Sequence, residues 1–155
     1  MEYGKFPAYR PRRMRATETM RRYIRETELS AKDFIYPLFV KPGSGLRDEI
    51  PSMPGVYQVS IDMLEAEMRE LAGLDVTSVL LFGIPSRKDE CGSEAYDGHG
   101  IVQEAVRAIR AKAPAMTVVT DVCMCEYTSH GHCGKLDGNG DVDNDATLEW
   151  LAAEA

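Results

Sequence analysis

The feature that most constrains the fold is a regular alternation of short apolar runs with helical patterns. The three apolar runs are residues 33–40, 76–85 and 116–124. The three helical patterns are residues 60–75, 101–114 and 144 onward. A strand–helix order repeated three times is typical of parallel α/β architecture, in which right-handed crossovers place the strands side by side. The chain is therefore expected to be an α/β protein.

Local signals predict further details of these elements. Pro37 lies inside the first apolar run and predicts an edge strand or a bulge. Residues 51–60 have the composition of a loop. Ser60 is the expected N-cap of the first helix, and Asn144 or Asp145 that of the third. The expected buried stripes are Leu64, Met68 and Leu71 in the first helix, which Gly73 could end, and Val102, Val106 and Ile109 in the second.

Two parallel architectures fit three strand–helix units: an open doubly wound sheet and part of a (β/α)8 barrel. A doubly wound nucleotide-binding fold would have a glycine-rich phosphate turn after its first strand. The turn found there, "KPGSG", has Gly43 and Gly45 but neither a third glycine nor a helix directly behind it. A barrel instead predicts functional residues at the carboxyl ends of strands, and a cysteine-rich segment lies there after the third run. The barrel is therefore the better interpretation.

Charge separates the beginning of the chain from the rest. The first 25 residues hold eight Lys and Arg against two Glu, a net charge of +6, whereas the remaining 130 residues sum to −13. Residues 1–30 are expected to form an N-terminal arm, and residues 31–155 an incomplete barrel domain. The aromatic residues Tyr3, Phe6 and Tyr9 suit an arm that docks on a partner subunit, although a solvated tail is an open alternative. Nucleic acid is a poor partner because the acidic body would repel phosphates.

Composition excludes several other classes of protein. The chain has 155 residues, the size of one ordinary domain. No apolar run approaches the roughly 20 residues that span a bilayer, so no membrane association is expected. The N-terminus lacks the apolar segment of a secretory signal, and a cytoplasmic, reducing location is therefore expected. Clustered thiols in that setting are more often metal ligands or catalysts than disulfides.

The segment "DVCMCEYTSHGHCG", residues 121–134, contains three of the four cysteines and two of the three histidines. Side chains alternate along a strand, so Asp121, Cys123 and Cys125 are expected to face the same way. Cys133 returns after a glycine-containing loop. Three thiolates could thus converge on one ion, and zinc is the metal that favours such ligands.

The nature of a fourth ligand stays open. Cys91, His130 and His132 are the candidates, and a fourth protein ligand would make the site structural. An open position would make it catalytic, because water or substrate could then bind. Spacing alone does not choose between the two. Buried free cysteines in a core are the simplest alternative, and a Cys–His nucleophile would not account for three clustered thiols.

An acidic segment, "DGNGDVDND" at residues 137–145, has some resemblance to a calcium-binding loop. An EF-hand loop that starts at Asp137 requires glycine at its sixth position and glutamate at its twelfth. Val142 and Leu148 occupy those positions. The segment is better interpreted as a polar turn that leads into the third helix.

These motifs together resemble one enzyme family. The segment "DVCMCEYTSHGHCG" followed by "NDATLEWL" closely resembles the porphobilinogen synthase (5-aminolevulinate dehydratase) family, in which Met124 is usually leucine. The resemblance extends along the whole chain. It includes "RPRRMR", "FIYPLFV", "SMPGVYQVS", "LFGIP", "KDECGS" and "VQEAVRAIR".

The resemblance implies a lyase of tetrapyrrole (heme) biosynthesis, with a (β/α)8 barrel that assembles into octamers. It implies an N-terminal arm that wraps a neighbouring subunit, and the condensation of two 5-aminolevulinates into porphobilinogen with loss of water. Cys123, Cys125 and Cys133 would be the Zn²⁺ ligands, and Asp121 would line the active site beside them. Mg²⁺ is a further candidate metal of the whole enzyme.

The family also uses two Schiff-base lysines on later strands, and none of the lysines here matches those positions. They are Lys5, Lys32, Lys41, Lys88, Lys112 and Lys135, and none is expected inside a strand. A (β/α)8 barrel takes about 250 residues. The sequence is thus expected to be an N-terminal half that carries the zinc ligands and is inactive alone. The alternative is a zinc-binding or oligomerisation fragment without catalytic activity.

Overall fold

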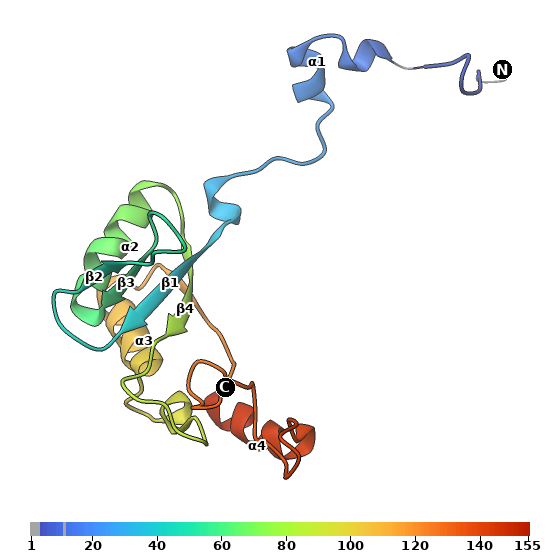
Figure 1. The fold of residues 1–155 in the computed structure, drawn as a ribbon. Coiled ribbons are helices and arrows are strands. Elements are labelled where there is room, and N and C mark those ends of the chain that lie inside the picture. The colour runs from blue at the N-terminus through green and yellow to red at the C-terminus, as the bar shows by residue number, and fades with distance from the viewer. Residues whose placement is uncertain (1–3, 11) are drawn as a thin grey trace. The chain divides into compact units, whose positions relative to one another are not determined.

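The computed structural model describes residues 4–10 and 12–155, which divide into two units at the Ser30–Ala31 boundary (Figure 1). The first unit contains a short 3-10 turn, Arg12–Arg15, and helix α1, Glu18–Tyr23. Thr17 caps α1 by accepting a hydrogen bond from the Met20 amide at 3.2 Å. Neither element has a buried residue, and the rings of Phe6 and Tyr23 are more than four-fifths exposed. Tyr3 lies outside the described residues.

The second unit is built on a five-stranded sheet. The strands are β1 (Ile35–Lys41), β2 (Arg47–Glu49), β3 (Tyr57–Ser60), β4 (Ser78–Gly83) and β5 (Thr117–Thr120). Their order across the sheet is β2-β3-β1-β4-β5. Strands β3, β1, β4 and β5 run parallel, and only β2 is antiparallel to its neighbour. The three expected strands are therefore adjacent and parallel, as the alternation of the sequence predicts.

Two helices connect parallel strands: α2 (Leu64–Gly73) lies between β3 and β4, and α3 (Ile101–Lys112) between β4 and β5. Helix α4 (Asn144–Glu154) follows β5, and 3-10 turns lie at Ala31–Asp33, Ile61–Met63 and Ser93–Tyr96. Helix α2 ends at Gly73 and buries the expected stripe of Leu64, Met68 and Leu71. Helix α3 buries a slightly different stripe from the one expected, Ile101, Ala105 and Ile109, while Val102 and Val106 are half-buried. No described helix has both the length and the apolar character that crossing a bilayer requires.

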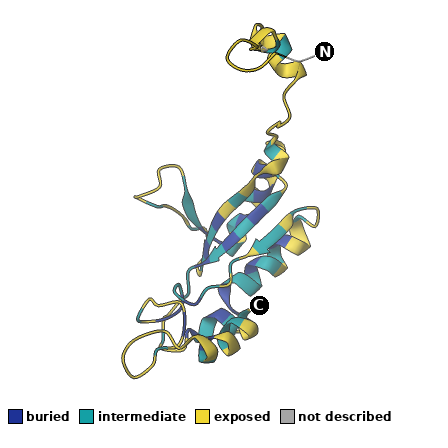
Figure 2. Ribbon diagram, turned by 90° about the vertical axis from the view of Figure 1, so that its right-hand side faces the viewer, coloured by how far each residue is buried: buried dark blue, intermediate teal, exposed yellow. Residues whose placement is uncertain are grey.

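Both α2 and α3 pack on the same face of the sheet. On that face the fully or almost fully buried side chains include Leu38 and Val40 from β1 and Val79 and Leu81 from β4. Figure 2 shows buried positions, in dark blue, recurring along the strands of the sheet. On the opposite face the rings of Phe39 and Phe82 stack with centroids 5.2 Å apart and remain only half-buried. A doubly wound sheet has helices on both faces, whereas the wall of a barrel has them only outside. The arrangement is that of a barrel wall.

Several sequence-based expectations were wrong in detail. Residues 57–60 form strand β3 and not a loop, because their backbone pairs with both β1 and β2. Pro37 lies in a central strand and not at the edge of the sheet. The β1–β3 ladder starts only at Phe39, so at Pro37 the strand has a neighbour on the β4 side alone, and the proline is tolerated.

Two helix starts also differ from expectation. Ser60 precedes a 3-10 turn and makes no side-chain cap. Its hydroxyl accepts a hydrogen bond from the Leu46 amide at 2.9 Å instead. Asp143, one residue before the expected positions, caps α4 by accepting from the Ala146 amide at 3.0 Å. In both cases side chains compete for backbone donors in ways that periodicity does not reveal.

The Asp62 carboxylate holds the loop that follows β1 through hydrogen bonds. One of its carboxylate oxygens accepts hydrogen bonds from the Ser44 hydroxyl at 2.9 Å and the Gly45 amide at 2.8 Å. The other accepts from the Ser60 hydroxyl. These donors hold the pKa of Asp62 below its ordinary value, the Ser60 hydroxyl having the largest effect.

Replacing Asp62 with alanine should therefore lower the melting temperature at pH 7. A carboxyl whose pKa is depressed by folding contributes stability above its unfolded pKa, about 4, and loses it as pH falls through the folded value. The difference in Tm between wild type and Asp62→Ala should accordingly shrink in acid. Thermal denaturation from pH 7 down to pH 2 tests this, with Asp62→Asn expected to be intermediate. A difference that is constant with pH would contradict the assignment.

Candidate metal centre

The candidate site forms where the loops after β4 and β5 meet, at the carboxyl ends of the parallel strands. Asp121 directly follows β5, and its amide donates to the Leu81 carbonyl of β4 at 3.4 Å. Further along, the Asp89 amide donates to the Tyr127 carbonyl at 3.3 Å, and the Ser129 amide donates to the Asp89 carbonyl at 2.8 Å. Two loops that are far apart in sequence are thereby joined by backbone hydrogen bonds.

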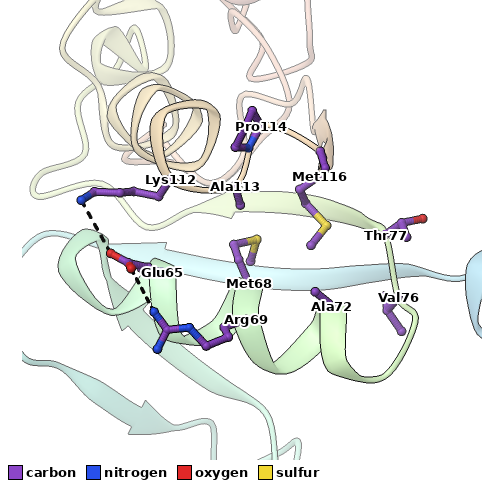
Figure 3. A pocket seen from close by; sticks show the side chains of 11 residues that line it. Glu65, Met68, Arg69, Ala72, Val76, Thr77, Lys112, Ala113, Pro114 and Met116 are labelled. Carbon is purple, nitrogen blue, oxygen red and sulfur yellow. Dashed lines mark hydrogen bonds and ion pairs between the residues drawn. The ribbon is translucent and has the colours of Figure 1, made fainter.

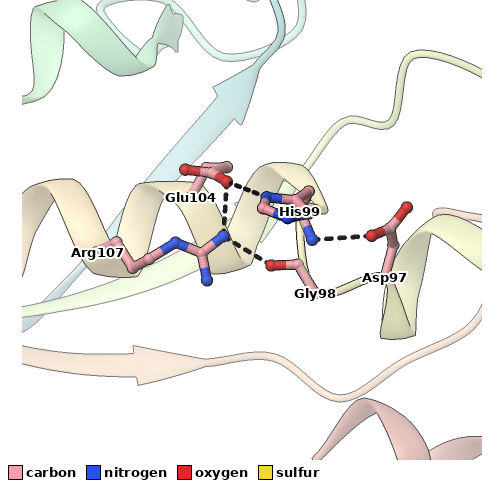
Figure 4. A network of polar contacts seen from close by, with 5 residues as sticks. All are labelled: Asp97, Gly98, His99, Glu104 and Arg107. Atoms are coloured by element: carbon pink, nitrogen blue, oxygen red, sulfur yellow. Dashed lines mark hydrogen bonds and ion pairs between the residues drawn. The ribbon is translucent and has the colours of Figure 1, made fainter.

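The loop after β4 is fixed at both of its ends. Near its start, both oxygens of the Glu94 carboxylate accept from the Ser86 amide at 3.1 Å. At its end, the His99 ring and Arg107 both bond the Glu104 carboxylate, at 3.0 and 2.6 Å (Figure 4). The Arg107 contact is the main reason that the pKa of Glu104 is lowered. These contacts are exposed, so they orient the loop more than they stabilise the fold.

The thiols of Cys123, Cys125 and Cys133 converge. The Cys123 Sγ lies 3.3 Å from the Cys125 Sγ and 3.5 Å from the Cys133 Sγ. All three sulfur atoms lie within 4.8 Å of one another. Cys123 and Cys125 are half-buried and Cys133 is exposed. The cluster is thus open to solvent on its Cys133 side.

The route to this convergence differs from the one expected. Strand β5 ends at Thr120 and not at Met124, so alternation along a strand does not orient the cysteines. A tight turn does so, because the Met124 carbonyl accepts from the amides of Tyr127 and Thr128 at 3.0 and 2.9 Å. The expected strand was too long, because the sequence run extends to Met124 whereas pairing with β4 ends at the Leu81–Thr120 pair.

A small second core holds this turn in place. Met124 is fully buried and packs with Ala95 and Tyr127, and with Trp150 and Leu151 of α4. Gly92 lies against it with φ of 58°, and a Cβ there would come within 2.5 Å of the Met124 Cε. The left-handed backbone favours glycine at that point, and a side chain there would also displace the end of the Met124 side chain.

Helix α4 places Cys133. The Thr128 hydroxyl donates to the His132 carbonyl at 2.8 Å, and the Lys135 amide donates to the Thr147 hydroxyl of α4 at 3.0 Å. A Cβ on Gly134 would lie 2.3 Å from the Thr147 Oγ1, so the chain beside Cys133 runs directly against the helix. These contacts hold the backbone beside Cys133 in a position that brings its thiol close to those of Cys123 and Cys125.

Carboxylates surround the thiols. Ligand atoms of Asp121, Cys123 and Glu126 lie within 4.8 Å of one another. The Cys125 Sγ lies 3.3 Å from the Glu126 Oε2, and the Glu154 Oε1 accepts from the Cys123 amide at 3.2 Å. Sequence reasoning selected Asp121 but missed both glutamates. The position of Glu126 next to Cys125 could have suggested it, whereas nothing local connects Glu154 to the motif.

Burial and negative charge both act on the ionisation of the site. Burial is the largest cause of the raised pKa values of the Cys123 and Cys125 thiols, and the charge of Glu126 adds to the effect in each. Burial likewise raises the pKa values of Glu154 and of the Tyr127 phenol. Without a cation, burial therefore favours the protonated form of the Cys123 and Cys125 thiols. A bound metal ion would supply the compensating positive charge and deprotonate them.

The donor set and its geometry fit a zinc ion. In a tetrahedral site with Zn–S distances of about 2.3 Å, neighbouring sulfur atoms are about 3.8 Å apart. The Cys123–Cys125 and Cys123–Cys133 sulfur separations, 3.3 and 3.5 Å, need only a small expansion. Thiolates are soft donors, which suit zinc, whereas the hard magnesium and calcium ions take oxygen ligands.

The candidate fourth ligands lie outside the cysteine cluster in the part of the chain that the structure describes. Neither histidine nor Cys91 belongs to the group of converging ligand atoms. His130 Nε2 lies 3.3 Å from the Glu90 carbonyl, and its Nδ1 accepts from the His132 amide at 3.2 Å. The histidines thus take part in loop hydrogen bonds.

The acidic segment after the cluster is a turn. The Asp137 carboxylate accepts from the amides of Asn139 and Asp141 at 2.8 and 3.0 Å, and these bonds lower its pKa. Asp143 then caps α4. The Asp137 and Asp143 carboxylates are thus engaged with the local backbone, which agrees with the interpretation as a polar turn.

An apolar cavity of about 330 Å³ lies at the opposite, amino ends of the strands (Figure 3). Met68 and Met116 point into it, and Glu65 bonds Arg69 at 3.0 Å and Lys112 at 3.7 Å along one side. In barrel enzymes this end of the strands contributes stability, while chemistry occurs at the carboxyl ends. The cavity is therefore not a candidate active site.

Fold and site define a class: an α/β chain of the barrel type with a thiol cluster at the carboxyl ends of its parallel strands. A family model described as "Delta-aminolevulinic acid dehydratase" matches residues 8–155, and the chain belongs to this family. Among curated proteins, the delta-aminolevulinic acid dehydratase of Halalkalibacterium halodurans is 49% identical over 94% of this chain and 44% of its own length. That of Synechococcus elongatus is 51% identical over 97% of this chain and 47% of its own length.

A solved structure shows the same relationship. The delta-aminolevulinic acid dehydratase (porphobilinogen synthase) of Toxoplasma gondii, in complex with the reaction product porphobilinogen, matches with a TM-score of 0.88 at 30% identity. The match covers 94% of this chain and 42% of that one. The predicted fold class, part of a (β/α)8 barrel, is thus confirmed. The chain spans about half the length of the first curated relatives that it matches.

Proposed function

We propose that this chain provides the zinc-binding part of a delta-aminolevulinic acid dehydratase, a lyase that condenses two 5-aminolevulinates into porphobilinogen in tetrapyrrole biosynthesis. The observation that carries the proposal is the convergence of three thiol sulfur atoms at the carboxyl ends of parallel strands in a member of this family. Family membership supplies the reaction, and the cluster identifies the part of its chemistry that these residues can support.

Cys123, Cys125 and Cys133 would hold the zinc ion. When bound, zinc would polarise a substrate carbonyl or bind an amine as a Lewis acid. Asp121 would line the substrate site, because it follows β5 directly and lies next to Cys123 and Glu126. The exposed side of Cys133 would leave room for substrate. The Asp121 carboxylate would bind and orient a polar or cationic group of the substrate there.

The imine-forming lysines of the reaction would come from the part of the relatives that lies outside this match. One expectation about the lysines was wrong, since Lys41 is the last residue of β1 and so lies inside a strand. Its amine forms an ion pair with Asp48, which is a structural contact and leaves it unavailable for attack on a carbonyl. Covalent catalysis by lysine needs a free, neutral amine in a buried site.

An assay of porphobilinogen formation tests the proposal. The chain alone should give no product. A mixture with the unmatched part of the Halalkalibacterium relative, co-expressed so that both fold together, should restore turnover. Turnover by the chain alone would refute the assignment of the lysines to the other part. Failure of both the mixture and zinc binding would refute the proposed function.

A zinc-binding or oligomerisation module without catalytic activity is the second candidate. The observation that favours it is the small core of Ala95, Met124 and Tyr127, which supports the cysteine turn entirely from within this chain. This candidate predicts that the chain alone is stable and binds zinc. It also predicts that adding the unmatched part of the relative produces no porphobilinogen. The same assay therefore separates the two.

The proposal includes a role for the N-terminal arm in assembly and a cytoplasmic location. The exposed Phe6 and Tyr23, which lie among basic residues, suit docking of the arm on another copy in a homo-oligomer such as the octamer of the family. Nucleic acid and membrane are not proposed as partners, and the proposed location is the cytoplasm, where thiols remain reduced. Mg²⁺ is proposed only as a further metal of the whole enzyme.

Zinc affinity should rise steeply with pH. Burial raises the pKa values of the Cys123 and Cys125 thiols above their ordinary value, so at neutral pH both must lose a proton to bind the metal. These two protons alone correspond to an affinity gain of at least about 100-fold per pH unit. Competition with a chelator of known pH dependence between pH 6 and 8 measures this slope. A flat profile would contradict thiolate ligation.

A further inference from the structure

We propose that Glu154 is a positioning residue for the metal centre: from α4 it fixes the backbone of Cys123 through a hydrogen bond. The inference rests on the proposed zinc function. Cys123 lies beyond the end of β5, so its amide has no place in the sheet ladder. The Glu154 Oε1 accepts from that amide at 3.2 Å, across 31 positions of sequence.

Helix α4 is anchored independently of this bond. Asp143 caps its first turn, and the Thr147 hydroxyl donates to the Asp143 carbonyl at 2.6 Å while accepting from the Lys135 amide. Trp150 and Leu151 pack against the core beneath the cysteine turn. The Glu154 carboxylate is therefore presented to Cys123 from a helix whose position is already determined.

The placement of Glu154 is costly unless it has a role. Its second oxygen, Oε2, is buried and has no hydrogen-bond partner in the described part of the chain. It lines a cavity of about 270 Å³ together with Asp121, Gln103, Arg107 and Tyr127. An incompletely satisfied carboxylate close to another acidic group opposes folding. Such costs persist where the group serves a site, and here the group bonds a residue of the thiol cluster.

The expected consequence concerns the orientation of one ligand. The Cys123 sulfur lies 3.3 Å from the Cys125 sulfur and 3.5 Å from the Cys133 sulfur, so the backbone position of Cys123 affects both separations. Residues that orient metal ligands typically change metal affinity by about 10- to 100-fold when removed. Glu154→Ala removes the acceptor, whereas Glu154→Gln retains an oxygen acceptor and removes only the charge.

Zinc affinity of the full chain, measured by competition with a chromophoric chelator, tests the proposal. Glu154→Ala should bind zinc about 10-fold more weakly, and Glu154→Gln within about threefold of wild type. Glu149→Ala is the matched control, because Glu149 is an exposed glutamate on the same helix. It should bind like wild type. The absorption spectrum of the Co²⁺-loaded chain should change for Glu154→Ala alone, and thermal denaturation checks that the variants fold.

Three outcomes would overturn the inference. Wild-type affinity in Glu154→Ala would show that the hydrogen bond does not position Cys123. Equal weakening in Glu154→Ala and Glu154→Gln would assign the effect to charge. Equal weakening in Glu149→Ala would assign it to α4 in general. Absence of zinc binding in the wild-type chain would instead refute the proposed function. This outcome differs from the three above, because each of them requires a wild-type chain that binds zinc.

Discussion

Replacing Cys125 with alanine is expected to abolish stoichiometric zinc binding. Cys125 contributes one of three converging sulfur atoms, and in the described residues no histidine or fourth cysteine is positioned to replace it. Loss of a direct ligand should exceed the 10- to 100-fold cost of losing a residue that only orients one, so the affinity should fall by at least about 100-fold. Zinc content after purification and chelator competition measure the change.

The matched control is Cys91→Ala. Cys91 is an exposed cysteine outside the cluster, so the same substitution there should leave zinc content unchanged. Undiminished zinc in Cys125→Ala would refute the site. Equal losses in both variants would indicate that zinc binds through some other set of thiols.

Replacing Met124 with alanine should destabilise the second unit by about 2–5 kcal/mol, the range found for large buried side chains cut to alanine. Met124 is fully buried beneath the cysteine turn, between Ala95, Tyr127 and Trp150. The cavity left behind should also loosen the turn, because the Met124 carbonyl holds the amides of Tyr127 and Thr128. Denaturant unfolding of the zinc-free and zinc-loaded chain measures both effects.

Met124→Leu provides the comparison for volume. It nearly conserves the apolar volume and should cost less than about 1.5 kcal/mol. Met53→Ala, at a methionine that is 39% exposed, should change stability by no more than about 0.5 kcal/mol. A small effect of Met124→Ala would mean that the second core contributes little to the stability of the site.

Much of the fold could be predicted from the sequence because its signals are local. The runs around Leu38 and Val79 are apolar and β-branched, and the buried apolar residues of α2 repeat with helical spacing. Each of these elements can therefore be recognised from a few neighbouring residues. β3 could not be recognised in this way. Its backbone pairs with two strands that are distant in sequence, and its local composition is that of a loop.

The candidate site was likewise predictable only in part. Cys123, Cys125 and Cys133 stand out because thiols are rare and their spacing is compact. The prediction that they converge is supported by the structure, but the reason given for it was wrong. A turn held by the Met124 carbonyl, and not the pleat of a strand, brings them together.

By itself the sequence determined the alternation of strands and helices, the resemblance to one enzyme family and the three candidate ligands. These follow from side-chain chemistry and from periodicities of a few residues. Only the tertiary structure decided that both helices cover one face of the sheet, that the histidines lie outside the cluster and that Glu154 reaches the Cys123 amide. The physical reason is that these contacts join residues tens of positions apart, and their partners are selected by packing and backbone hydrogen bonding.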